Sequence, residues 1–246
     1  EIGSGLVGSE MCIRDRVIGG EIISADSMQV YKYMDVGSAK ITPEEMDGVP
    51  HHLVDVLEPT EDFNIVLFQQ MAKEAMKGIY DRGRIPVLVG GTGFYIQALL
   101  YDIDFTSTSQ DDNYRQDLEN LAKEKGAEYL HNMLREIDPK SAEDIHANNI
   151  KRVIRALEYY HQTGQKMSRH NEEERQKESP YEFVYFVLNA PREQLYQRID
   201  RRVDQMMSEG LVEEVKRLKE MGCTKEMVSM LSLIHISEPT RPEPIS

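Results

Sequence analysis

Short apolar runs alternate with a long amphipathic stretch over the first hundred residues. The runs lie at residues 22–23, 52–57 and 85–89. Asn64 is a favoured N-cap, and the apolar positions after it follow a 3.6-residue period as far as Arg82-Gly83. A helix is also expected over 94–101, and Thr42-Pro43-Glu44-Glu45 has the form of a capping box. Strands separated by helices predict a parallel α/β sheet, whose first part spans residues 17–110.

Residues 111–179 carry helical periods and no strand pattern. Helices are expected over 113–125, 127–137, 140–146 and 149–163, and the charged stretch 169–178 is expected to lead out of the region. One face of the fourth helix is apolar and consists of Ile150, Val153, Ile154, Leu157 and Tyr160. Lys151, Arg152 and Arg155 lie largely off that face. The region is therefore predicted to be an all-helical insertion in the α/β core.

Residues 180–230 return to the pattern of the core. The near-continuous apolar run 181–188 (YEFVYFVL) is typical of a strand covered on both faces. Pro191 then begins a predicted helix, and another follows Gly210 and ends at Gly222. This segment is expected to supply the second part of the sheet and its covering helices.

Composition narrows the class of protein. With 40% hydrophobic and 29% charged residues among 246, the chain is typical of a soluble globular protein. No apolar run approaches the ~20 residues of a membrane span, and the N-terminus lacks the pattern of a signal peptide. Cys12 and Cys223 lie far apart, which favours a reducing cytoplasm and no disulfide. The net charge of −14 argues against general affinity for nucleic acid but permits a local basic face.

Two turns at the ends of predicted strands hold the candidate chemistry. Asp26 could be a general base, a magnesium ligand or only a helix cap. The turn Gly90-Gly91-Thr92-Gly93 lies between a strand and a helix, so its N–H groups could approach a phosphate. A tight turn of this kind also needs glycine for structural reasons alone. Because ligands gather at the carboxyl ends of strands in open α/β sheets, the two turns are expected to meet at one edge.

Two basic clusters are candidates for phosphate binding. Lys151, Arg152 and Arg155 could contact an RNA backbone, although most such helix faces are merely solvated. Arg198 and Arg202 lie four residues apart, hence on one face of a helix. They could clamp phosphates, or they could pair with neighbouring carboxylates at Glu193, Asp200 and Asp204. The histidines show no metal-ligand spacing, so no metal ligand is predicted.

Five runs, in order along residues 17–230, resemble the tRNA dimethylallyltransferase (tRNA isopentenyltransferase) family. They are ISADSMQVYKYMDVGSAK, PHHLVD, GRIPVLVGGTGFYIQALL, DIHANNIKRVIRALE and RIDRRVDQMMSEGLVEEV. The resemblance implies a P-loop kinase-like α/β core with a helical insertion that grips the tRNA anticodon stem-loop. It further implies transfer of the dimethylallyl group of dimethylallyl diphosphate to N6 of the adenine 3′ of the anticodon. A magnesium ion in the complete protein and a cytoplasmic monomer are expected with it.

Carried over onto this chain, the resemblance gives roles to particular residues. Asp26 resembles the general base that takes a proton from the attacking N6 amine, and the segment Asp26-Ser27-Met28-Gln29 resembles the one that holds the target base. Thr92 and Arg115 resemble two further substrate-contact positions of the catalytic site. The tRNA-contact helix corresponds to Lys151, Arg152, Val153, Ile154 and Arg155. Phosphate binding is expected from Gly90, Gly91, Arg198 and Arg202.

The chain departs from the family's pattern at both ends. The family carries a G-x-x-x-x-G-K-[ST] loop before the first matched strand, whereas here Gly3 and Gly8 are followed by Ser9-Glu10 without a lysine. Residues 1–16 and 231–246 are therefore expected to be foreign sequence, and the chain as it stands is expected to be an inactive fragment. Two alternatives stay open: a small-molecule P-loop kinase, and a non-catalytic RNA-binding protein.

Overall fold

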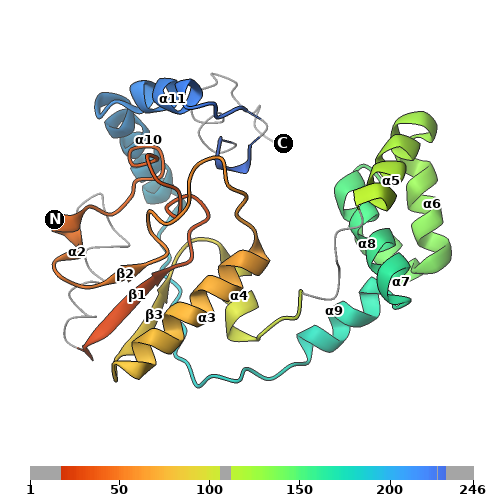
Figure 1. Cartoon of the computed structure of the whole chain (residues 1–246), viewed down its shortest axis with the longest axis horizontal. Helices are drawn as coiled ribbons and strands as arrows, with labels where there is room; N and C mark the ends of the chain where they lie inside the picture. Colours follow the sequence, from red (N-terminus) through yellow and green to blue (C-terminus); the bar gives the residue numbers. More distant parts are fainter. Residues whose placement is uncertain (1–17, 106–111, 226, 231–246) are drawn as a thin grey trace. The chain divides into compact units, whose positions relative to one another are not determined.

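The computed structural model describes residues 18–105, 112–225 and 227–230 (Figure 1). The chain divides into two compact units. The first consists of Glu1–Leu99 together with Phe183–Ser246, and the second consists of Leu100–Glu182. The second unit contains the predicted helical insertion and extends beyond it at both ends.

The first unit is built on a three-stranded sheet with the order β2-β1-β3. β1 (Gly20–Ser24) pairs in parallel with β2 (His51–His52) on one side and with β3 (Ile85–Val89) on the other. Every residue of β1 is buried, as the central strand of a covered parallel sheet should be. The strand predicted over 52–57 is wrong in extent, because Leu53 and Asp55 have φ angles of 63° and 55° that end the extended conformation.

Helices predicted from capping signals are confirmed in this unit. α2 (Pro43–Met46) has the predicted capping box, in which the Thr42 hydroxyl accepts from the Glu45 N–H and the Glu45 carboxylate accepts from the Thr42 N–H. α3 (Ile65–Asp81) is capped by Asn64, and α4 (Gly93–Leu100) follows the glycine turn. α3 lies alongside the sheet (Figure 1). Its Phe68 ring stacks on Tyr95 of α4 with centroids 4.6 Å apart, which joins the two helices.

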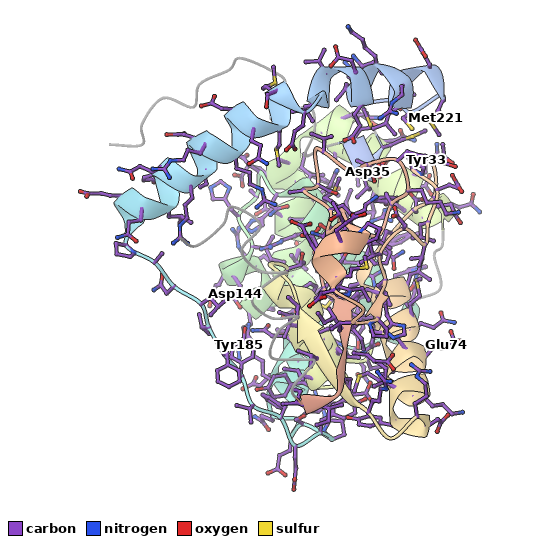
Figure 2. The ribbon with its side chains drawn as sticks, turned by 90° about the vertical axis from the view of Figure 1, so that its left-hand side faces the viewer. Tyr33, Asp35, Glu74, Asp144, Tyr185 and Met221 are labelled. Atoms are coloured by element: carbon purple, nitrogen blue, oxygen red, sulfur yellow. The ribbon has the colours of Figure 1, made fainter. Side chains whose placement is uncertain are left out.

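The first unit also contains two later helices, α10 (Arg192–Ser208) and α11 (Leu211–Glu220). The strand predicted over 181–188 is wrong, because these residues form no strand in the structure. The side chains from Phe183 to Leu188 are between 41% and 79% exposed, and Figure 2 shows Tyr185 on this segment. An apolar run becomes a strand only where a neighbouring strand supplies backbone hydrogen bonds, and the described residues place none beside it.

The second unit is all-helical, as predicted. Its helices are α5 (Asp112–Lys125), α6 (Ala127–Ile137), α7 (Pro139–Asp144), α8 (Ile150–Thr163) and α9 (Met167–Arg175). Val153, Ile154 and Leu157 of α8 pack in its hydrophobic core. The predicted apolar face of α8 is corrected at one position, since Tyr159 is buried while Tyr160 is 37% exposed. The charged stretch 169–178, expected only as an exit, contributes most of α9.

Asp138 ties three helices of this unit together. Its carboxylate accepts hydrogen bonds from the backbone N–H and hydroxyl of Ser141 and from those of Ser168. Burial opposes the charged form, but the four hydrogen bonds outweigh burial and hold the pKa of Asp138 below its usual value. A charged residue at the junction of α6 and α7 therefore also fixes the start of α9.

Candidate active site

Asp26 lies two residues beyond the end of β1, at the carboxyl edge of the sheet. Its Oδ1 accepts hydrogen bonds from the backbone N–H groups of Met28 (2.8 Å) and Gln29 (3.3 Å). These bonds close the turn that contains Ser27, so Asp26 caps a turn rather than the helix that the structural alternative named. Both bonds use Oδ1, and the side chain is half-buried.

The glycine turn meets the Asp26 turn at the same edge of the sheet, as predicted. The Ala25 N–H donates to the Val89 carbonyl (2.7 Å), and the Thr92 N–H donates to the Ala25 carbonyl (3.3 Å). A Cβ atom on Gly90 would lie 2.3 Å from the Ala25 oxygen, whereas one on Gly91 would meet nothing within 4 Å. Gly90 is therefore needed for close approach of two backbones. Phosphate binding by Gly90 and Gly91 stays a prediction.

Tyr95 is a neighbour of Asp26 that the sequence did not single out. Its hydroxyl pKa is raised by burial and by the negative charge of Asp26. Its N–H donates to the Thr92 carbonyl (2.9 Å), so the ring is fixed by the first turn of α4 as well as by Phe68. In the sequence this tyrosine belongs to an apolar helix face, and no local signal separates it from core residues. Burial and the negative charge of Asp26 thus both favour the protonated form of the Tyr95 phenol.

Arg198 and Arg202 lie on α10 in the first unit, and both side chains are exposed. The pairing with Glu193, Asp200 or Asp204 that the spacing allowed is not formed among the described residues. Their positive charges are thus not neutralised by ion pairs there. A role in phosphate binding stays a prediction.

Arg115, the third catalytic candidate, lies on α5 in the second unit. Its Nε is 3.6 Å from a carboxylate oxygen of the buried Glu158 and 3.9 Å from one of Glu119. The guanidinium therefore compensates for a carboxylate that is nearly inaccessible to water. A substrate contact by Arg115 stays a prediction.

The predicted tRNA-contact segment of α8 divides into two kinds of residue. Lys151 and Arg152 are exposed, Arg155 is half-buried, and none of the three forms an ion pair within the described ranges. Val153 and Ile154 are 0% and 2% exposed in the core of the unit. The prediction is corrected for these two, because the 3.6-residue period turns their side chains inward where RNA cannot contact them. The basic side chains alone form a cationic surface, which we call the α8 basic face.

Comparisons with known proteins agree with this arrangement. The IPP transferase family matches residues 29–238, which is most of the chain. The chain belongs to the IPP transferase family. A tRNA dimethylallyltransferase of Lachnoclostridium phytofermentans is 60% identical over 216 residues, which cover 88% of this chain and 69% of that protein. The tRNA dimethylallyltransferase of Carboxydothermus hydrogenoformans is 52% identical with the same coverage.

Solved structures of IPP transferases have the same fold. The full-length tRNA isopentenylpyrophosphate transferase of Bacillus halodurans has a TM-score of 0.65 at 42% identity, covering 95% of this chain and 73% of that one. A eukaryotic dimethylallyltransferase acting on tRNA has a TM-score of 0.75 at 30% identity, covering 92% of this chain and 56% of that one. The predicted fold class, a P-loop kinase-like α/β core with a helical insertion, is confirmed.

Two kinds of feature are absent from the described residues of this IPP transferase. No helix within them combines the length and the apolar character needed to cross a bilayer. Nor do they contain a cluster of three or more His, Cys, Asp or Glu side chains that could bind a metal ion.

Proposed function

We propose that this IPP transferase moves the dimethylallyl group of dimethylallyl diphosphate onto N6 of the adenine 3′ of the anticodon in tRNA, with Asp26 as the general base. The proposal rests on the finding that Asp26 and the glycine turn meet at one edge of the sheet, in a chain that is 60% identical to a tRNA dimethylallyltransferase. Neither the kinase alternative nor the purely RNA-binding alternative is favoured by relatives of this kind.

The chemistry assigns distinct tasks to the two turns. An exocyclic amine is a weak nucleophile because its lone pair is delocalised into the ring, so removing its proton as the C–N bond forms lowers the barrier. The N6 proton passes to Oδ2 of Asp26, the bond from N6 to the allylic carbon forms, and the bond from that carbon to the diphosphate oxygen breaks. The electron pair leaves with the diphosphate, whose growing negative charge needs N–H donors and cations.

The glycine turn can supply part of that stabilisation. The Thr92 N–H already donates to Ala25, so it is not available to a diphosphate. The Thr92 hydroxyl and the N–H of Gly91 are the groups we assign to the leaving group, and the open space around Gly91 lets a phosphate oxygen approach. The exposed Arg198 and Arg202 supply cations of the right kind.

Binding of tRNA is assigned to the α8 basic face. The target base must leave its stack to reach the allylic carbon, so the RNA has to be held by contacts that do not involve that base. Cations without a carboxylate partner are the groups that release counterions from a phosphate backbone. The α8 basic face meets that requirement even though the whole chain is acidic.

The test is prenyl transfer to an anticodon stem-loop RNA by Asp26→Asn. An asparagine oxygen can still accept from Met28 and Gln29, so the turn is kept while the base is lost. We expect single-turnover transfer, followed by mass spectrometry of the RNA, to fall about 10²-fold or more, with stem-loop affinity within about threefold of wild type. The assay is run on the 246-residue chain and on the same chain carrying a complete G-x-x-x-x-G-K-[ST] loop, since residues 1–16 contain no lysine.

The matched control is Asp26→Ala, which removes both the cap and the base. A larger loss in the alanine variant than in the asparagine variant measures what the turn itself contributes. Transfer by Asp26→Asn within a few-fold of wild type would show that Asp26 is only a turn cap and that another group takes the proton.

A further inference from the structure

Glu214 of α11 is a buried carboxylate that the proposed chemistry does not use. The residue is 0% exposed. Its Oε2 accepts from the backbone N–H groups of Asp35 and Val36, both at 2.8 Å, and its Oε1 accepts from that of Gly37 at 2.9 Å. Figure 2 shows Asp35 beside this helix. A charge withdrawn from water is costly, so three charge-assisted hydrogen bonds to one loop require an explanation.

The helix places this carboxylate rigidly. Leu211, Val215 and Leu218 of α11 are all buried, so the helix is anchored by apolar contacts on either side of Glu214. Three consecutive N–H groups pointing at one anion form the kind of concave donor set that binds phosphates elsewhere. Here the anion comes from the chain itself, 179 residues away from Asp35 in sequence.

The loop that Glu214 holds is strained. Tyr33 and Ala39 have φ angles of 63° and 44°, in the left-handed region that side chains with a Cβ rarely adopt. Such conformations persist only where surrounding contacts fix them. Lys40 provides a second clamp, donating to the Tyr31 carbonyl (2.8 Å) and to the Asp35 carboxylate (2.7 Å). Glu214 and Lys40 thus both hold the loop, Glu214 through the backbone from Asp35 to Gly37 and Lys40 through the Asp35 side chain.

The same loop contacts the segment of the candidate base. The Ala39 carbonyl accepts from the Gln29 side-chain amide (3.4 Å), whose oxygen in turn accepts from the Ser24 hydroxyl (3.4 Å). The backbone N–H of Gln29 donates to Asp26 Oδ1. The orientation of the Gln29 amide, which can offer both a donor and an acceptor to a base edge, therefore depends on where the loop puts the Ala39 carbonyl.

We propose that Glu214 is a positioning residue that fixes the loop Asp35–Ala39 and thereby sets the Gln29 amide that distinguishes adenine from other bases. This assignment rests on the proposed function and on the expectation, from the family resemblance, that the segment Asp26–Gln29 holds the target base. Glu214 touches no substrate. It acts through the loop, and its effect is on base discrimination rather than on affinity for the RNA backbone.

The experiment compares Glu214→Ala with Glu213→Ala. Glu213 is the exposed neighbour in the same first turn of α11, so it matches the charge change without touching the loop. The first readout is hydrogen exchange at the Asp35, Val36 and Gly37 amides. The second is the ratio of affinities for two anticodon stem-loops, one with adenine at the target position and one with cytosine, which also carries an exocyclic amine. That ratio does not depend on the folded fraction.

We expect Glu214→Ala to raise exchange at the three amides at least about tenfold and to lower the adenine preference about tenfold, while Glu213→Ala changes neither. Glu214→Gln keeps one oxygen acceptor, so its exchange rates and its adenine preference should lie between those of wild type and of Glu214→Ala. It replaces the alanine variant in the comparison if that variant does not fold. Unchanged exchange, or a loosened loop with an unchanged ratio, overturns the proposal. A wild type without adenine preference overturns it as well. Adenine preference without any prenyl transfer would count against the proposed function alone.

Discussion

Protonation of Glu21 is expected to remove a measurable part of the stability of the first unit. Glu21 lies in β1 with 2% of its surface exposed. Arg82 donates to its two oxygens at 2.9 and 2.6 Å, His52 Nε2 lies 2.7 Å away and Arg84 3.6 Å away. The hydrogen bonds of Arg82 do most to lower the pKa of Glu21, burial opposes them, and His52 adds to them, which brings the pKa from 4.5 to about 2.

The magnitude follows from that shift. A pKa lowered from 4.5 to about 2 corresponds to at most about 3 kcal/mol of folding free energy. Arg82 and Arg84 are each 48% exposed, so solvent screening reduces the expected value to about 1–3 kcal/mol. Because the pKa in the folded state is the lower one, this stabilisation is present above pH 4.5 and is lost as the pH falls from 4.5 towards 2.

The assay compares Glu21→Gln with wild type in urea at pH 6, 4 and 2.5. The chain has no tryptophan, so unfolding of the sheet is followed by hydrogen exchange of peptides covering β1 and β3. The free-energy difference should be about 1–3 kcal/mol at pH 6 and should fall to about a quarter of that value at pH 2.5, where Glu21 in the folded state is still largely ionised. Glu74→Gln, an exposed carboxylate on α3 (Figure 2), is the control and should change little at any pH. A difference that is constant with pH, or that grows as the pH falls, would refute the assignment.

Two further predictions concern the glycine turn and the α8 basic face. Gly90→Ala should destabilise the first unit by about 1–3 kcal/mol or more, because its Cβ would overlap the Ala25 backbone. Gly91→Ala should destabilise it by only a few tenths of a kcal/mol, because that Cβ would meet nothing within 4 Å. Equal shifts in melting temperature for the two variants would contradict the close approach of Gly90 and Ala25. Reversing the charge of all three residues of the α8 basic face should weaken binding of the stem-loop. The slope of log affinity against log salt should become shallower by up to about one for each phosphate that is no longer bound. An unchanged slope would show that this face is only solvated. The residues are Lys151, Arg152 and Arg155.

Signals that act within a few residues were sufficient to predict most of the helices. The Thr42 capping box and the Asn64 cap both appear in the structure with the expected hydrogen bonds. The meeting of Asp26 and the glycine turn also followed, because the carboxyl ends of neighbouring parallel strands share an edge. These predictions succeeded since each depends on the local chain or on a general rule of sheet topology.

The predictions that failed concern features that depend on which part of the chain packs beside a segment. The run 181–188 has the composition of a strand that is covered on both faces. Composition alone does not show which other strand or helix would pack against it. Leu53 and Asp55 end β2 through left-handed backbone that neither residue type signals. Glu214 was missed for a related reason, since its partners are three backbone N–H groups, and any residue except proline supplies one.

The buried carboxylates change what the net charge of −14 implies. Glu21, Asp138 and Glu214 are each less than 3% exposed and are compensated by cations, hydroxyls or backbone N–H groups. These three negative charges are therefore buried and held by partners inside the two units. On the α8 basic face, to which we assign RNA binding, the structure places instead a set of cations with no carboxylate partner among the described residues. An acidic sequence can therefore present a surface suited to phosphate, because binding responds to the charges within a Debye length, about 8 Å at physiological salt, and not to the total.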